Sequence, residues 1–209
     1  MNKNHFIRID EPDIKYTEIY KSSPGNTIPN VFDIKINGIT YVFKNLEIIY
    51  RIEEFVEFLN NRYDKIMTLS KIDISGLVKV FNKVVMIKHK KQNEEYFFSV
   101  GYLMEKINGK NCNSLSDKEF ELYDASKYSI YKRVYKTLQE LFDKYKLCHN
   151  DICPSNIMWD SESDKVSIID IDFRNEVGDG SLYESEYFET NDSFINKTLV
   201  LLKNIKQIK

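Results

Sequence analysis

The dipeptide Asn37-Gly38 constrains the fold of this chain more than any other local feature. It separates two runs with strand character, 31–36 and 39–43, and both of its residues tolerate the positive φ of a two-residue hairpin turn. In the first run successive side chains alternate between the two faces of the strand. One face carries Val31, Asp33 and Lys35, and the other carries Phe32, Ile34 and Ile36. The first half of the chain is therefore predicted to begin as a twisted antiparallel sheet.

Two segments, 46–69 and 127–145, instead have apolar residues at helical spacing. Strands and helices that follow one another in this way are typical of an α+β fold. Around the two helices we expect further strands and a terminal helix, over 16–21, 77–87, 96–104, 157–159, 166–169 and 191–208.

Composition excludes several classes of protein. With 30 Lys and Arg against 32 Asp and Glu, the 209-residue chain lacks the charge imbalance of a nucleic-acid binder. Three cysteines cannot build a disulfide framework, and no apolar run approaches the ~18 residues of a membrane span. We therefore expect a cytoplasmic protein without a transmembrane segment.

Two polar segments near the C-terminus carry the chemistry. Asp151 and Asn156 lie five residues apart in a loop that contains Pro154, and Asp170 closes a β-branched strand. Because Mg²⁺ prefers oxygen ligands and keeps water or phosphate in its remaining positions, Asn156 and Asp170 are candidates to hold it. Asp151 then remains to accept a proton.

These segments read H-x-D-x-x-x-x-N and V-x-I-I-D, which resembles the protein-kinase-like phosphotransferase superfamily. The resemblance implies catalytic roles for Asp151, which would orient and deprotonate the acceptor hydroxyl, and for Asn156. It also implies that Asn156 and Asp170 hold Mg²⁺ against the phosphates of ATP, and that His149 braces the loop. Asp172 is the alternative to Asp170 as the metal ligand.

The same resemblance implies a nucleotide site in the first half of the chain. Lys44 ends the strand Tyr-Val-Phe-Lys, in the place of the family's phosphate-pairing lysine. Its acidic partner is expected on the following helix. Glu57 has the more usual separation from Lys44, whereas Glu53 lies nearer the apolar stripe.

The segment 102–109 resembles the hinge that joins the two lobes of this family. By that match, Met104 lines the nucleotide pocket, and backbone groups near Glu105 and Ile107 bind adenine. The expected fold is a two-lobed, kinase-like α+β fold. Residues 1–107 would form an N-terminal antiparallel sheet with one helix, and residues 108–209 a reduced, mainly helical lobe.

Departures from the common pattern narrow the expected substrate. The place of the glycine-rich loop holds one glycine, Gly25, and no A-P-E segment follows Asp170. The run Asp-Ile-Cys-Pro-Ser-Asn is similar to the D-L-H-P-G-N of aminoglycoside, choline and lipopolysaccharide-core kinases. The short second lobe resembles that of minimal atypical kinases.

These features lead to one expected function and three alternatives. We expect an ATP- and Mg²⁺-dependent phosphotransferase acting on a hydroxyl of a sugar, glycan or other small alcohol, with a protein partner left open. The alternatives are a minimal atypical protein serine/threonine kinase, a pseudokinase scaffold, and a metal-dependent hydrolase. The hydrolase would use the side chains of His149, Asp151, Asp170 and Asp172.

Overall fold

The computed structural model describes residues 5–10, 13–15, 30–90, 95–149, 152–171 and 182–184. They form a mixed α+β structure whose chain forms two compact units, Met1–Ile72 with Lys79–Lys106 and Asp73–Val78 with Ile107–Lys209. The first unit contains β1 (Phe6–Ile9), β2 (Asp13–Lys15), β3 (Val31–Ile36), β4 (Ile39–Ile49), α1 (Ile52–Leu69), β5 (Val80–Lys90) and β6 (Tyr96–Met104). The second contains β7 (Lys110–Asn111), α2 (Asp117–Tyr145), β8 (Leu147–His149), a 3-10 turn (Pro154–Asn156), β9 (Ile157–Asp160), β10 (Lys165–Ile168) and β11 (Leu182–Glu184).

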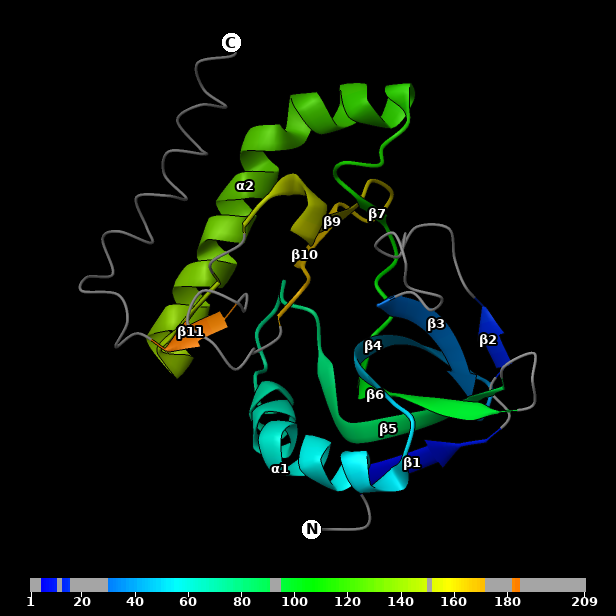
Figure 1. The fold of residues 1–209 in the computed structure, drawn as a ribbon. Helices are drawn as coiled ribbons and strands as arrows, with labels where there is room; N and C mark the ends of the chain where they lie inside the picture. The colour runs from blue at the N-terminus through cyan, green and yellow to red at the C-terminus, as the bar shows by residue number, and fades with distance from the viewer. Residues whose placement is uncertain are drawn as a thin grey trace. The chain divides into compact units, whose positions relative to one another are not determined.

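A six-stranded sheet in the order β1-β5-β6-β4-β3-β2 forms the frame of the first unit (Figure 1). Its neighbouring strands are antiparallel except for β1, which runs parallel to β5 at the sheet edge. The predicted hairpin is confirmed, because Asn37 and Gly38 join β3 to β4 with φ angles of 51° and 81°. β1 was not predicted, since its four residues carry no turn signal that marks them as a strand.

The two faces of this sheet have different neighbours. One face carries a buried aromatic and aliphatic cluster that includes Phe32, Phe43 and Leu103. The other face is covered by α1, since the ring of Phe55 on that helix lies 5.0 Å from the ring of Phe6 on β1. The strand register places Lys44 on this second face.

The predicted start of the first helix was wrong. Helical spacing suggested a start at Leu46, but β4 continues as far as Ile49, which pairs with Phe98 on β6. The β-branched residues Ile48 and Ile49 favour the extended conformation. α1 therefore begins at Ile52.

The second helix begins ten residues earlier than predicted, at Asp117 instead of Lys127. Ser116 caps it, because its backbone N–H and its hydroxyl donate to the Glu119 carboxylate at 3.0 and 2.5 Å. Lys110 also donates to Glu119 at 2.8 Å, and these bonds, led by that of Lys110, lower the pKa of Glu119 to about 2. Serine is a preferred residue at this first capping position of a helix.

The segment Asp73–Val78 belongs to the second unit, although the sequence suggested that a strand of the first sheet begins at Leu77. The backbone N–H of Val78 donates to Ile168, and that of Ile168 donates to Gly76, at 2.9 and 2.8 Å. Tyr145 on α2 accepts a 3.0 Å hydrogen bond from the backbone of Asp73. The segment therefore extends the small sheet of β10 and β9, and it does not form the start of β5.

Among the described residues, no helix is long and apolar enough to cross a membrane. The predicted strand at 16–21 and the terminal helix at 191–208 lie outside the described residues.

Candidate functional site

In the second unit, strand pairing brings the backbone of Asn156 close to that of Asp170, the two predicted metal ligands. β9 follows Asn156 directly, and its first residue, Ile157, pairs with Ile168 at the end of β10. One residue beyond that pair, the backbone N–H of Ile169 donates a 2.9 Å hydrogen bond to the carbonyl oxygen of Asn156. Asp170 therefore directly follows the residue whose backbone is hydrogen-bonded to Asn156.

Asp170 has a backbone conformation that L-residues rarely adopt, with φ at 64°. The other non-glycine residues with positive φ among the described residues lie in hairpin turns or at the end of α2, where such angles are expected: Asn37, Asp164 and Lys146. Asp170 instead follows a strand end. Residues held in sparsely populated backbone regions cluster at functional sites, because their surroundings must enforce the strain.

His149 is hydrogen-bonded to the same strand, and its predicted role in bracing the loop stays a prediction. Its side chain is 1% exposed, and its Nε2 lies 3.1 Å from the carbonyl oxygen of Ile169. Since a carbonyl oxygen can only accept, Nε2 carries the proton and donates. Ile169 is thus bonded through its carbonyl to His149 and through its N–H to Asn156.

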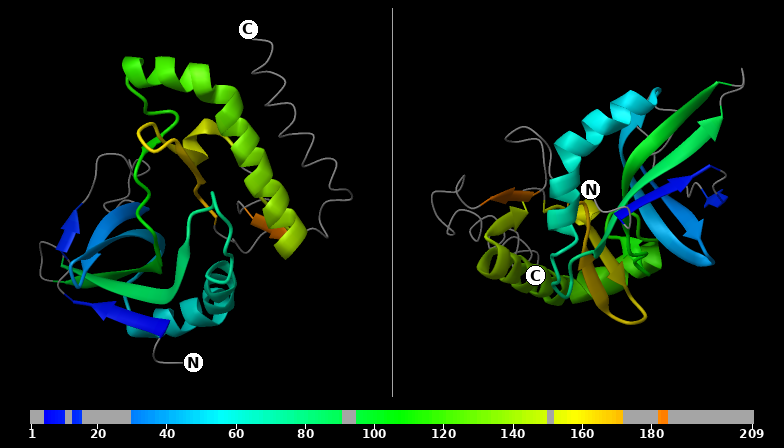
Figure 2. Two further views of the ribbon diagram at one scale, coloured as in Figure 1. Left: turned by 180° about the vertical axis from the view of Figure 1, so that it is seen from behind. Right: turned by 90° about the horizontal axis from the view of Figure 1, so that it is seen from below.

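The β9–β10 hairpin, which carries Asn156 at one end and leads to Asp170 at the other, is tied to α2 (Figure 2). Arg133 on α2 donates to the Asp164 carboxylate at 2.8 Å, and the indole N–H of Trp159 donates to the same group at 3.1 Å. These donors, with Arg133 first, lower the pKa of Asp164. The hairpin is therefore fixed at its tip as well as at its base.

The loop before the hairpin is held by side chains as well. Asn111 on β7 donates to the carbonyl oxygen of Ser155, and the Ser155 hydroxyl lies 2.8 Å from the Cys153 sulfur. Pro154 occupies the first position of the 3-10 turn, where its fixed φ is compatible. Asn156 at the end of this turn is 9% exposed. The predicted catalytic Asp151 and the alternative ligand Asp172 lie outside the described residues.

In the first unit, Lys44 lies on the face of the sheet that α1 covers. Residues paired across strands point to the same face, and Lys44 pairs with Tyr102, which pairs with Val84, which pairs with Phe6. Phe6 contacts α1 through Phe55. Lys44 is half-buried there.

Gly101 allows the strand next to Lys44 to approach closely. It pairs with Asn45 beside a β-bulge, and a Cβ atom at this position would lie 1.8 Å from the carbonyl oxygen of Lys44. No side chain other than hydrogen fits at that distance. The backbone of Lys44 is therefore positioned by a glycine on the neighbouring strand.

The two predicted acidic partners of Lys44, Glu53 and Glu57, are exposed on α1. Glu54 between them accepts hydrogen bonds from the backbone N–H of Tyr50 and from the side-chain Nε–H of Arg51, each at 2.9 Å. The backbone bond from Tyr50, followed by that from Arg51, lowers the pKa of Glu54. The pairing of Lys44 with Glu53 or Glu57 stays a prediction.

Glu47 on β4 carries a carboxylate that interacts with charged side chains of α1. Burial raises the pKa of Glu47, Arg62 on α1 lowers it, and Glu57 and Glu54 raise it further. Glu57 therefore lies close enough to Glu47 to repel it. Glu47 was not among the site residues predicted from the sequence.

The predicted hinge begins at the end of β6. Met104 is 6% exposed and pairs with Val42 and Val80, so it shares a sheet face with Lys44. Glu105 is fixed to the start of β5, because its N–H donates to the carbonyl of Lys79 and its carboxylate accepts from the N–H of Lys79, both at 2.9 Å. Ile107 is half-buried and is the first residue of this stretch that belongs to the second unit.

Sequence reasoning also missed a buried carboxylate beside these residues. Asp33 on β3 pairs with Val42, which pairs with Met104, so its side chain points to the Lys44 face. Its carboxylate forms an ion pair with Lys106. An aspartate in mid-strand is itself a signal, because aspartate is depleted in strands.

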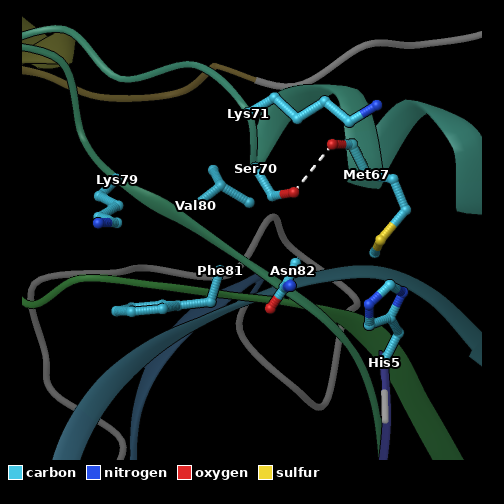
Figure 3. A pocket seen from close by; sticks show the side chains of 8 residues that line it. All are labelled: His5, Met67, Ser70, Lys71, Lys79, Val80, Phe81 and Asn82. Carbon is cyan, nitrogen blue, oxygen red and sulfur yellow. Dashed lines mark hydrogen bonds between the residues drawn. The ribbon is translucent and has the colours of Figure 1, made fainter. Parts of the chain in front are cut away.

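A separate cavity of about 520 Å³ lies in the first unit, where the end of α1 meets the start of β5 (Figure 3). Its polar groups include Lys71, Lys79 and the hydroxyl of Ser70, which donates to the carbonyl of Met67 at 2.8 Å. Figure 3 shows His5 and Met67 among the side chains that line it. None of the predicted site residues lines it.

The residue types at Asn156 and Asp170 fit Mg²⁺, since both side chains offer oxygen atoms and leave room for phosphate oxygens. Within the part of the chain that the structure describes, no group of three or more His, Cys, Asp and Glu side chains gathers as a metal site. No protein-family model and no curated protein sequence matches this chain.

Proposed function

We propose that this chain is an ATP- and Mg²⁺-dependent phosphotransferase with a two-lobed, kinase-like fold. The observation that carries the proposal is the strained backbone of Asp170, which is held beside Asn156 by hydrogen bonds on both sides of Ile169. A strained carboxylate next to a second oxygen ligand suits a divalent cation that must be placed accurately.

The order of elements supports the same proposal. The chain runs from the β3–β4 hairpin through Lys44, α1 and the segment after Met104 to α2, the loop at Asn156 and the strand before Asp170. This is the order in which the resemblance places the hairpin, phosphate-pairing lysine, helix, hinge, long helix, catalytic loop and metal strand.

In this proposal Asn156 and Asp170 hold Mg²⁺, whose charge neutralises the phosphates of the nucleotide. Lys44 pairs with those phosphates, and the backbone near Glu105 and Ile107 binds the base. Asp151 orients the acceptor hydroxyl and takes its proton. Catalysis comes mainly from positioning and charge neutralisation, so the protein contributes fixed geometry in place of covalent chemistry.

We propose a sugar, glycan or other small alcohol as the acceptor, and the cytoplasm as the place of action. The acceptor rests on Pro154 and on the Ile-Asp-Ile-Asp run that ends at Asp172, which resemble small-molecule kinases. The hydrolase alternative fits less well, because the Nε2 proton of His149 is directed to a backbone carbonyl.

Transfer of radiolabelled γ-phosphate tests the proposed function. The purified chain is incubated with labelled ATP and Mg²⁺, together with pools of sugars, glycans and amino alcohols and with a mixed protein substrate. Label on a small alcohol, lost in Asp151→Asn and retained in Asp143→Asn, supports the proposal. Asp143 is exposed on α2 and provides a matched loss of one charge.

Two results would replace the proposal. Label on the protein substrate alone would favour the serine/threonine kinase alternative. Nucleotide binding with no transfer to any acceptor would favour the scaffold alternative.

A further inference from the structure

The cavity at the end of α1 has the size of a small-molecule site. Its volume of about 520 Å³ falls within the roughly 300–1,000 Å³ of typical ligand pockets. β1 pairs with β5 only from Phe6 and Val84 onward, so the first residues of β5, beginning at Val80, extend beyond β1. The cavity lies between this extension and the end of α1 (Figure 3).

Three of the less exposed side chains that line the cavity are apolar. Val80 is 1% exposed, and Met67 and Phe81 are half-buried. Apolar surface that leaves contact with water on binding favours association. A ligand that fills this space therefore gains from an apolar body.

The most exposed side chains of the cavity are polar, and two of them are lysines. Lys71, Lys79 and Asn82 are all exposed. Each lysine carries an ammonium group with three donors on a flexible stem, so both can turn toward a bound anion. His5 adds an imidazole to the lining, and its ring is held in place by the Tyr63 hydroxyl, 2.7 Å from Nδ1.

Among the described residues, the lining of the cavity contains no Asp or Glu. The carboxylate of Glu105, which accepts from the backbone N–H of Lys79, is not part of it. Two ammonium groups at a cavity without a carboxylate in its lining produce a positive local potential, which attracts anions. The polar part of a fitting ligand is therefore anionic.

We propose that this cavity is a second binding site of the first unit, for a small organic anion. The apolar body of the ligand lies against Val80 and Met67, and its carboxylate or phosphate group is bound by Lys71 and Lys79. The site is separate from the proposed nucleotide site, because Lys44 and the other predicted site residues do not line it.

Titration of the isotope-labelled chain, followed by NMR, tests the site and locates the ligand. The probes are benzoate and phenyl phosphate, and the comparison compounds are neutral benzyl alcohol and the ring-free anions acetate and inorganic phosphate. Both aromatic anions should shift the amide signals of Ser70 and Val80 and bind severalfold more tightly than the comparison compounds. The tighter of the two identifies the preferred anionic group.

Two double variants separate the cavity from general charge attraction. Lys71→Gln with Lys79→Gln should weaken binding of the aromatic anions by about fivefold or more, because each exposed ion pair contributes up to about fivefold. Lys132→Gln with Lys136→Gln removes the same charge from exposed positions on α2 and should leave binding unchanged. Thermal unfolding without ligand verifies that both double variants are folded.

The contrary results are equally specific. Equal binding of benzyl alcohol and the aromatic anions would show that the cavity does not select anions, and equal weakening in both double variants would show unspecific attraction. Signal changes at Lys44 and Met104 in place of Ser70 and Val80 would assign the anion to the proposed nucleotide site. Each of these results, or no binding by the folded chain at millimolar probe, overturns the inference and leaves the proposed function standing.

Discussion

The backbone N–H of Ile169 donates to the carbonyl oxygen of Asn156 at 2.9 Å, and this bond joins the two segments that carry the proposed metal ligands. It continues the β9–β10 pairing by one residue, directly before Asp170 turns into the left-handed region. The proposed site therefore depends on this backbone geometry as well as on its side chains.

His149 is the residue whose loss should disturb that geometry first. His149→Phe removes the donor to Ile169 and leaves a buried carbonyl unpaired, which should lower the free energy of unfolding by about 1–3 kcal/mol. His149→Gln offers an amide N–H at a similar reach and should recover part of the loss. Urea unfolding measures both variants, and equal stabilities of the two would argue against this hydrogen bond.

Gly101 should tolerate no larger residue. Gly101→Ala places a Cβ atom 1.8 Å from the carbonyl oxygen of Lys44, so the strands must separate. We expect a loss of about 3 kcal/mol or more in unfolding free energy. Gly38→Ala is the control, because its Cβ meets nothing within 4 Å and only the φ of 81° is strained, at a cost of about 1 kcal/mol. Similar losses in the two variants would contradict the close approach at Lys44.

The stability of the first unit should depend on pH through His89. Burial lowers its pKa from 6.5 to about 4. Between these values the unfolded chain binds more protons than the native one, so lowering the pH through this window favours unfolding. Chemical unfolding at pH steps from about 6.5 to about 4 should show a falling free energy of unfolding.

The matched variant for this test is His89→Phe. His89 stacks on Phe97 with ring centroids 5.0 Å apart, and a phenylalanine keeps the stacking without the titrating group. Its stability should change less over the same pH window. Parallel pH profiles for wild type and variant would assign the dependence to other groups.

The two cysteines with described side chains should differ in reactivity. Burial raises the pKa of the Cys112 thiol to about 12, whereas Cys153 is half-buried beside Ser155. In a Cys148→Ser background at pH 8, a maleimide should label Cys153 well before Cys112, because the thiolate is the reactive form. Urea should abolish the difference, and equal native rates would contradict the burial of Cys112.

The sequence predicted the parts of the fold that local signals determine. The hairpin at Asn37 and Gly38 follows from turn chemistry, and the cap at Ser116 from its side chain. The start of α1 could not be placed from periodicity, because pairing of β4 with β6 overrides the helical spacing after Leu46. Asp73–Val78 belongs to the second unit because its backbone is hydrogen-bonded to Ile168. Such a contact between residues far apart in the chain leaves no pattern in the local sequence.

The candidate site was predictable to a similar extent. The residue types at Asn156 and Asp170 suggested that their two segments converge, and one strand pair brings the backbones of these segments together. Asp33 and Glu47 were missed, because strand register decides which face a residue shares with Lys44. Burial of one oxygen of Asp33 depends on tertiary packing and leaves no pattern in the sequence.

Calorimetric titration of Mg²⁺·ATP into wild-type protein, Asp170→Ala and Asp143→Asn tests the central claim most directly. We predict that wild type and Asp143→Asn bind alike, that EDTA abolishes or strongly weakens binding, and that Asp170→Ala weakens it by more than about tenfold. Equal binding by wild type and Asp170→Ala, or no binding by folded wild type at millimolar ATP, would contradict a magnesium-nucleotide site at Asn156 and Asp170.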